Sequence, residues 1–230
     1  MSNVKRVADD LRTKTSATGV DYLITTQGGP PNGRHSLTSD APPHETHFAI
    51  QILSRFGLAY LLASSGTLRD TWLNICAPGG TSSPAPDVDD VELAAPGKFG
   101  FLASGARDTA VSDGLTAYFP TVFPHLRALH TFPGFVHTRA AANQGFPAPV
   151  VWASSLFGPL LARTPIGNTA TGYAEVPLYL VANKEARDRG EEMLFTSAVG
   201  LRNLGRPRWT VDEPESVKRL WDNMKEKLGV

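Results

Sequence analysis

Apolar positions along the chain follow a helical period in some segments and form short continuous runs in others. Val4, Val7 and Leu11 recur at helical spacing, which predicts a helix over residues 2–14. Segment 47–62 repeats in the same way, with apolar residues on both sides, so we expect a helix that is buried or forms a dimer. Further helices are predicted over 102–119, 176–182 and 213–228, the first of them ended by Pro120 and Pro124.

The continuous apolar runs predict strands, because each is short and is bounded by turn residues. They cover 21–26, 71–76, 128–132 and 193–199, and Pro133 and Gly134 stop the third at Phe132. Strands and helices alternate along the chain. This order predicts an α/β fold in which a parallel sheet carries helices on both faces, within one domain over residues 1–230.

Two other segments are predicted to lack regular structure. Residues 81–97 are rich in proline and aspartate and are expected to form a surface loop. Residues 134–177 are rich in glycine, proline and aromatic side chains. A loop of that length inside a compact domain is usually functional, so we expect a lid over a binding site.

Composition excludes several classes of function. The 230 residues include 22 lysines and arginines and 22 aspartates and glutamates, so no positive field favours nucleic acid or an anionic membrane. Cys76 is the single cysteine, which fits a reducing compartment. The first residues lack the apolar core of a secretory signal, and we therefore expect a cytoplasmic protein.

Several segments resemble the short-chain dehydrogenase/reductase family, in its divergent branch from filamentous fungi. Thr26-Gln27-Gly28 stands where that family has the turn after its fourth strand, and residues 74–79 occupy the strand that normally ends in the catalytic serine. Pro133, Gly134 and Thr138 match the turn after strand six. The resemblance implies a Rossmann-like sheet, a pocket at the carboxyl ends of its strands, and a homodimer formed through the helices at 48–60 and from Leu102 onward.

The departures from that family bear on the chemistry. No glycine-rich phosphate turn precedes the first strand, so the resemblance implies an N-terminally truncated Rossmann-like domain. The serine position falls near Ala77 or Pro78, and the Tyr-x-x-x-Lys pair falls at Phe99 and Ala103. Phenylalanine has no proton to transfer, so hydride chemistry loses its general acid. We therefore expect no nicotinamide cofactor.

A vacated cleft at the strand ends would suit an apolar small molecule. The residues expected to bind that substrate are Cys76, Phe99, Phe101, Phe132, Phe135, Trp152 and Phe157, with ordinary core positions as the alternative for each aromatic side chain. No base can be assigned to Cys76 from the sequence, so a buried thiol is its default interpretation.

Three polar residues are candidates for catalysis, each with a structural alternative. Gln27 follows a strand end and could bond a substrate carbonyl, or only its own turn. Arg107 would stabilise charge in the cleft, or form a surface salt bridge. His137 would act as acid or base, or face solvent from a loop. Asp113 is expected to be solvated.

No metal is predicted. His35, His44 and His47 are the nearest approach to a ligand cluster, but Pro42 and Pro43 interrupt them and no carboxylate or cysteine pattern completes a site.

Three functions remain open at this point. The first is a cofactor-independent, non-redox enzyme of natural-product biosynthesis, a cyclase (with pericyclases included) or an isomerase acting on an apolar molecule. The second is a non-catalytic scaffold that pairs with a full-length homologue through the edge strand at 22–26. The third is an NAD(P)H-dependent reductase.

Overall fold

The computed structural model describes residues 1–29, 31, 33–143, 145–164, 166–197 and 201–230. Its central sheet has the strand order β1-β2-β3-β6-β7. The first four are parallel and β7 is antiparallel to β6. The strands are β1 (Val20–Thr25), β2 (Leu68–Ile75), β3 (Arg127–Phe132), β6 (Phe195–Ser197) and β7 (Arg202–Asn203). The predicted α/β class is confirmed.

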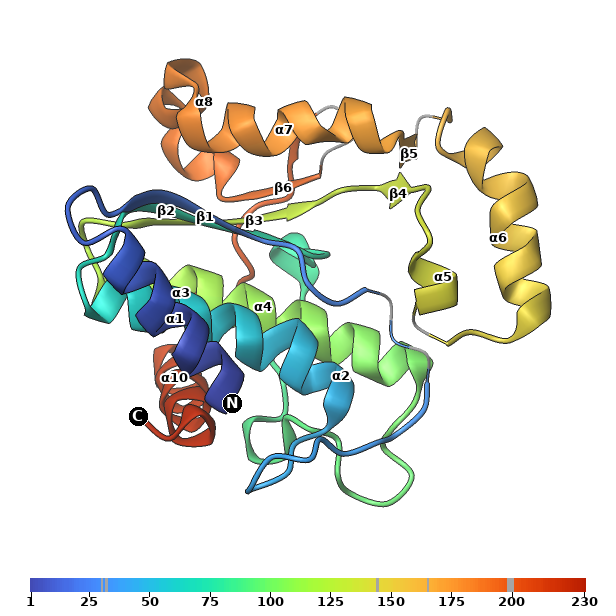
Figure 1. The fold of residues 1–230 in the computed structure, drawn as a ribbon, viewed down its shortest axis with the longest axis horizontal. Coiled ribbons are helices and arrows are strands. Elements are labelled where there is room, and N and C mark those ends of the chain that lie inside the picture. Colours follow the sequence, from blue (N-terminus) through green and yellow to red (C-terminus); the bar gives the residue numbers. More distant parts are fainter. Residues whose placement is uncertain (30, 32, 144, 165, 198–200) are drawn as a thin grey trace.

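Helices cover both faces of this sheet (Figure 1). The lower face in that view carries α1 (Ser2–Lys14), α3 (Ser54–Ser64) and α4 (Phe101–Val122), with α10 (Pro214–Leu228) packed beneath them. A short α2 (Thr46–Phe48) and a π-helical turn (Ala49–Leu53) lead into α3. The opposite face carries α7 (Ala170–Ala182) and α8 (Lys184–Asp188), while α9 (Trp209–Asp212) precedes α10.

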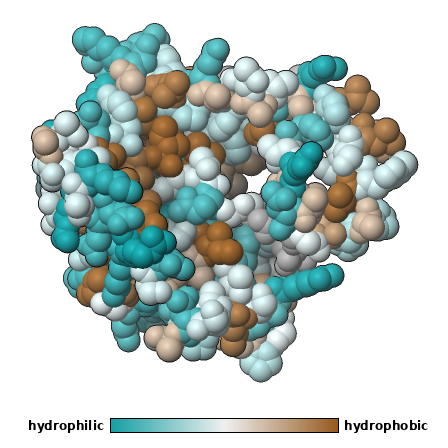
Figure 2. All heavy atoms as spheres, in the orientation of Figure 1, coloured by the Kyte–Doolittle hydropathy of each residue, from teal (hydrophilic) through white to brown (hydrophobic). Residues whose placement is uncertain are grey.

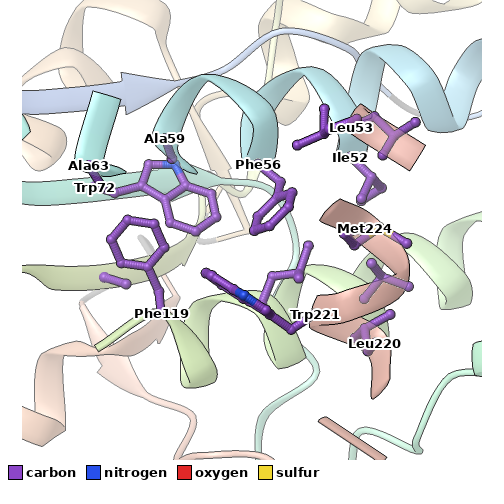
Figure 3. Packing of buried hydrophobic residues seen from close by; sticks show 14 of the residues in the cluster. Ile52, Leu53, Phe56, Ala59, Ala63, Trp72, Phe119, Leu220, Trp221 and Met224 are labelled. Carbon is purple, nitrogen blue, oxygen red and sulfur yellow. The ribbon is translucent and has the colours of Figure 1, made fainter. Parts of the chain in front are cut away.

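The larger core lies between the sheet and the layer formed by α3, α4 and α10 (Figure 3). Phe56 of α3 meets Trp221 of α10 edge-on, with ring centroids 4.8 Å apart, and Trp72 of β2 stacks on Phe119 of α4 at 5.0 Å. These four side chains are almost completely buried. The apolar residues of segment 47–62 therefore form part of the core. The resemblance implies a dimer through α3 and α4, but in this chain α10 packs against both of these helices.

Most element ends agree with the predicted ones to within a few residues, but α7 begins at Ala170 and not at residue 176. Helix α4 does not stop at Phe119 but runs to Val122, so the expectation that Pro120 ends it is wrong. Proline removes only one N–H bond and lies here in the last turn, where little helix remains to be disrupted. Of the predicted strand at 193–199, residues 195–197 form β6, and residues 198 and 199 lie outside the described residues.

The segment expected to be an irregular lid is largely helical, which corrects the prediction. It contains β4 (Phe135–Val136), α5 (Ala140–Asn143), α6 (Ala148–Leu161) and β5 (Gly167–Asn168), and α7 begins within it. Prolines misled the prediction because Pro147 precedes the first turn of α6, where no N–H bond is lost. Residues 137–164, called the arm below, project from the body beyond the carboxyl ends of the strands (Figure 1).

Candidate functional site

A cluster of buried polar side chains lies where β1, β2 and β3 end. Asn74 of β2 is paired in register with His130 of β3. Alternate residues of a strand share one face, so Cys76, two residues past Asn74, lies on the same face as both. That face is covered by α3 and α4, which add the remaining members of the cluster.

His130 is held by a carboxylate from α4. Its Nδ1 lies 2.9 Å from Oδ1 of Asp113, and both side chains are completely buried. The second oxygen, Oδ2, accepts a hydrogen bond of 3.0 Å from the amide of Gly79. With the carboxylate as the acceptor, Nδ1 carries its proton toward Asp113, and Nε2 is the ring nitrogen that can gain or lose a proton. The expectation that Asp113 is solvated is wrong, because this face of α4 lies against the sheet.

The thiol of Cys76 lies beside the His130 ring. Gln51 Nε2 donates to the sulfur over 2.9 Å, and the backbone amide of Cys76 donates to Thr131 over 3.0 Å. Nε2 of His130 is buried without a hydrogen bond of standard geometry to any described residue. The thiol is nevertheless close enough to the ring to raise the pKa of His130. Cys76 is only partly buried, which corrects the default interpretation of a buried thiol.

The pKa of His130 is displaced by opposing effects. Burial alone lowers it, but the hydrogen bond that the ring donates to Asp113 and the neighbouring Cys76 thiol raise it more, and the resulting pKa lies above the usual value. The imidazolium is thereby favoured at the one place in the sheet where a thiol adjoins it. Histidine, carboxylate and thiol together form an arrangement known from cysteine nucleophiles in general.

Arg55 of α3 bridges the ends of β1 and β2 beside this cluster through hydrogen bonds. Its guanidinium donates to the carbonyls of Gln27 and Ile75 and to the side chains of Asn74 and Gln51. Burial lowers the pKa of Arg55, while the nearby Cys76 opposes that change. Gln51 accepts a hydrogen bond from Arg55 through Oε1 and donates one to the Cys76 thiol through Nε2. These two partners set the orientation of its side-chain amide.

The three predicted catalytic residues do not lie together. Gln27 is near the cluster, but its side-chain amide donates to Ser54 Oγ over 3.0 Å, not to its own turn. Arg107 is buried on α4, where it donates to Asp108 over 2.7 Å and to Glu45 over 3.3 Å. Its guanidinium also lies 5.0 Å from the Phe48 ring centroid. The guanidinium of Arg107 is thus bonded within the protein. Both the prediction that it faces the cleft and the alternative of a surface salt bridge are wrong.

His137 belongs to the arm. Its ring packs against Gly158 of α6, and its Nδ1 is buried without a partner among the described residues. With Thr138, Ser154 and Ser155 it borders a hollow of about 270 Å³ between α5 and α6. It is therefore not the solvent-facing loop histidine of the structural alternative.

The predicted aromatic residues are mostly exposed, so the core alternative fails for four of them. Phe101, Phe132, Trp152 and Phe157 are 49%, 40%, 66% and 52% exposed. Phe99 and Phe135 are partly buried, and the Phe99 ring meets that of His35 edge-on at 5.0 Å.

The middle of the arm is uncharged, whereas Arg139 and Arg163 near its two ends are exposed. No residue from 140 to 162 is charged, and Figure 2 shows apolar side chains on the arm and a hollowed surface between arm and body. The arm is joined to the body by an edge-on contact of Phe146 with Phe101, 6.5 Å between centroids, at the start of α4. This hollowed surface is distinct from the hollow between α5 and α6, and it lies beyond the carboxyl ends of the strands, where ligands bind in open α/β sheets.

The histidines weighed as metal ligands have other partners. His44 Nδ1 lies 3.2 Å from Glu92, and His47 Nε2 lies 2.7 Å from Asp108. Within the described ranges no group of three or more histidine, cysteine or carboxylate side chains is arranged to hold a metal ion.

Comparisons with known proteins fit this architecture. The chain matches an uncharacterized protein from Mycobacterium paratuberculosis at 20% identity and a TM-score of 0.56, over 98% of this chain and 70% of that one. It also matches a gluconate 5-dehydrogenase from Burkholderia cenocepacia bound to NADP and tartrate, at 16% identity and TM-score 0.50, over 86% and 70%. The fold is Rossmann-like.

A third structure of this fold is an NADPH-bound carbonyl reductase from chicken fatty liver, matched at 14% identity and TM-score 0.50, over 89% of this chain and 73% of that one. No protein-family profile and no curated protein matches the sequence. At these identities the likeness extends to the fold alone, and the chemistry has to be argued from this chain's own residues.

The turn after β1 does not fit a dinucleotide. A phosphate cradle needs free backbone amides and open space beside the glycines. Here the amide of Gly29 donates to Gln51 Oε1 over 3.1 Å, and a Cβ on Gly28 would collide with the same side chain. The turn is packed against the π-helical segment, so its residues do not fit the pyrophosphate of a nicotinamide cofactor.

No helix in the described part of the chain is long and apolar enough to cross a bilayer.

Proposed function

We propose that this chain is a cofactor-independent, non-redox enzyme that rearranges an apolar small molecule by proton transfer at the carboxyl edge of its sheet. The observation that carries the proposal is the buried His130–Asp113 pair beside Cys76. Burying two ionisable groups costs several kcal/mol per ion before their attraction is counted. Such arrangements concentrate at functional sites, because acid–base chemistry needs groups with displaced pKa values.

The arm supports an apolar substrate. Its helix α6 is uncharged, carries the exposed side chains of Trp152 and Phe157, and lies beyond the carboxyl ends of the strands, the edge of the sheet at which the polar cluster stands. Apolar walls with few polar groups favour hydrophobic ligands. Among cyclisation and isomerisation, the two rearrangements compatible with the sequence, the acid–base pair favours isomerisation.

Two features support a reaction without nicotinamide. The glycine turn after β1 is occupied by Gln51, and the position that resembles the family's tyrosine is Phe99, which cannot ionise. The sequence also has no tyrosine between Tyr60 and Tyr118 that a shift of register could bring to the position of Phe99. A carbonyl accepting hydride would thus lack its proton donor.

Thermal unfolding with and without NADPH or NADH tests this proposal. A ligand present at 100 times its Kd that binds only the folded chain adds about 2.7 kcal/mol. We expect no shift with either nucleotide. A clear shift would overturn cofactor independence and restore the reductase hypothesis.

A screen of apolar carbonyl compounds by the same method tests the substrate class. We expect stabilisation of the wild type that is weakened in Trp152→Ala. The matched control is Val211→Ala, which alters a side chain of similar exposure, 61%, on α9. An equal response of both variants would remove the arm from the binding site.

The scaffold hypothesis also has an observation in its favour. In the described residues β1 is the edge of the sheet, and it exposes Tyr22 and Ile24, 39% and 36% accessible. Unpaired edge strands with apolar side chains favour pairing with another chain. Light scattering of the wild type and of Ile24→Lys would show a concentration-dependent assembly that the charge abolishes; a monomer at all concentrations would contradict self-pairing.

A further inference from the structure

We propose that Cys76 is a nucleophile that adds reversibly to a carbon–carbon double bond conjugated with a carbonyl group, with His130 as its proton partner. This inference rests on the proposed function and names the substrate class and the covalent step. A thiol alone would not carry it. The second observation is His130 Nε2, a completely buried ring nitrogen without a hydrogen-bond partner in the described residues, on the same face as the thiol.

The neighbouring groups fix both partners. Asp113 holds the ring through Nδ1, and Gln51 holds the sulfur from the side of α3. Arg55 adds a buried positive charge near the sulfur. These contacts place a hydrogen-bond donor and a buried positive charge beside the sulfur, and it is the thiolate form of a cysteine that acts as a nucleophile. Cys76 is also partly accessible, whereas His130 and Asp113 are not, so a substrate reaches the sulfur first.

Backbone amides argue against acyl transfer as the alternative thiol chemistry. That reaction needs N–H donors next to the nucleophile to stabilise an oxyanion on the attacked carbon. The amide of Cys76 is bonded to Thr131, Pro78 has no N–H, and the amide of Gly79 is bonded to Asp113, so two of the nearby amides are already engaged. Conjugate addition places the negative charge on a carbonyl oxygen three bonds beyond the attacked carbon. It therefore does not need donors at the sulfur.

The step balances without an oxidant or reductant. The thiolate forms a bond to the β-carbon, and the π electrons of the double bond move to give an enolate. Rotation about the former double bond follows, while His130 keeps its proton or lends it to the α-carbon and takes it back. The enolate then re-forms the double bond and expels the thiolate. The substrate leaves as its geometric isomer, and enzyme and proton return to their starting states.

Covalent labelling tests the nucleophile first. The folded chain is treated with N-ethylmaleimide, a conjugated imide, and the mass increase is followed; it reports on Cys76 alone because the chain has one cysteine. We expect the wild type to react faster than the same chain in urea at pH 6. His130→Gln should slow labelling by about 100-fold, in the range found for removal of a general acid or base.

The matched control is His125→Gln, which changes an exposed histidine on the loop before β3 and should label at the wild-type rate. Asp113→Asn tests a positioning role: it should change the pH dependence of labelling and not only its rate. Equal labelling of the folded chain and the urea-unfolded chain would overturn the inference, whether or not the variants fold.

Turnover tests the reaction. Dimethyl maleate is incubated with the protein, and its conversion to dimethyl fumarate is followed through the vinyl proton resonances. We expect conversion by the wild type and by His125→Gln, and none by Cys76→Ser. Labelling without conversion of this probe or of longer enones would overturn the isomerisation. An unreactive thiol together with no NADPH shift would refute this inference and leave the proposed function standing; a NADPH shift would refute the function whatever the thiol does.

Discussion

His130 of β3 and Asp113 of α4 share a hydrogen bond of 2.9 Å between two completely buried side chains. The pair is surrounded by Cys76 from the end of β2, the buried charge of Arg55 near that thiol, and the uncharged ring of Phe195 at 6.3 Å. Among the carboxylates of the described residues, Asp113 is thus the one that raises the pKa of His130.

This relationship predicts how stability depends on pH. The pKa of His130 in the folded chain lies above its ordinary value of 6.5. A raised pKa contributes stability that is fully present below the unfolded value and is lost as the pH rises through the folded value. We expect the free energy of unfolding in urea to fall as pH rises above about 6.5. Asp113→Asn should flatten this decline and His125→Gln should not; stability that rises over that interval would contradict the assignment.

Arg107 is predicted to be structural. Replacing it by methionine leaves Glu45 and Asp108 buried without their cation, which typically costs about 3–5 kcal/mol. Arg12→Met is the control, because Arg12 pairs with Asp9 at the surface, where such pairs contribute about 0–1 kcal/mol. Denaturant midpoints measure both. A small change at Arg107 accompanied by loss of turnover would instead place it in the catalytic site.

Gly158 is predicted to fix the arm. A Cβ at this position of α6 would collide with the ring of His137, so Gly158→Ala should destabilise the chain by about 1–3 kcal/mol or displace the arm. Gly105→Ala is the matched control inside α4, where an added Cβ would lie 4.0 Å from Cγ of Pro31, and it should stabilise the chain by about 0.5–1 kcal/mol. Thermal unfolding compares them. If both variants were equally stabilised, the His137 ring would be able to move away from the added Cβ without loss of stability.

Trp152 is predicted to dominate fluorescence quenching by acrylamide. It is 66% exposed, whereas the other three tryptophans, Trp72, Trp209 and Trp221, are 1–5% exposed. We expect Trp152→Phe to remove most of the readily quenched emission while leaving the unfolding midpoint unchanged. Unaltered quenching in this variant would mean that the arm folds against the body in solution. An apolar substrate should protect the wild-type residue in the same experiment.

The sequence located Cys76 and the strand end that presents it, but not its partners. His130 stands inside a predicted strand, and an ionisable residue in a buried run was the available signal that something must pair with it. Asp113 gave no such signal, since the helix around it has polar residues on several sides. Gln51 and Arg55 were likewise hidden in an apolar helix, where only the docking of α3 on the sheet shows which side they face.

The periodicity of the chain by itself predicted the four parallel strands, the helices α1, α3, α4, α7 and α10, and the parallel α/β class, because those depend on which neighbours along the chain share a face. Only the tertiary structure decided which side chains from distant segments meet at the candidate site. The register of β2 against β3 sets Cys76 beside His130, and the docking of α4 places Asp113 behind the ring. The helical arm was also beyond sequence reasoning, since prolines that usually interrupt helices stand there at positions that tolerate them. Contacts between distant segments depend on how whole elements pack, and local patterns do not record that.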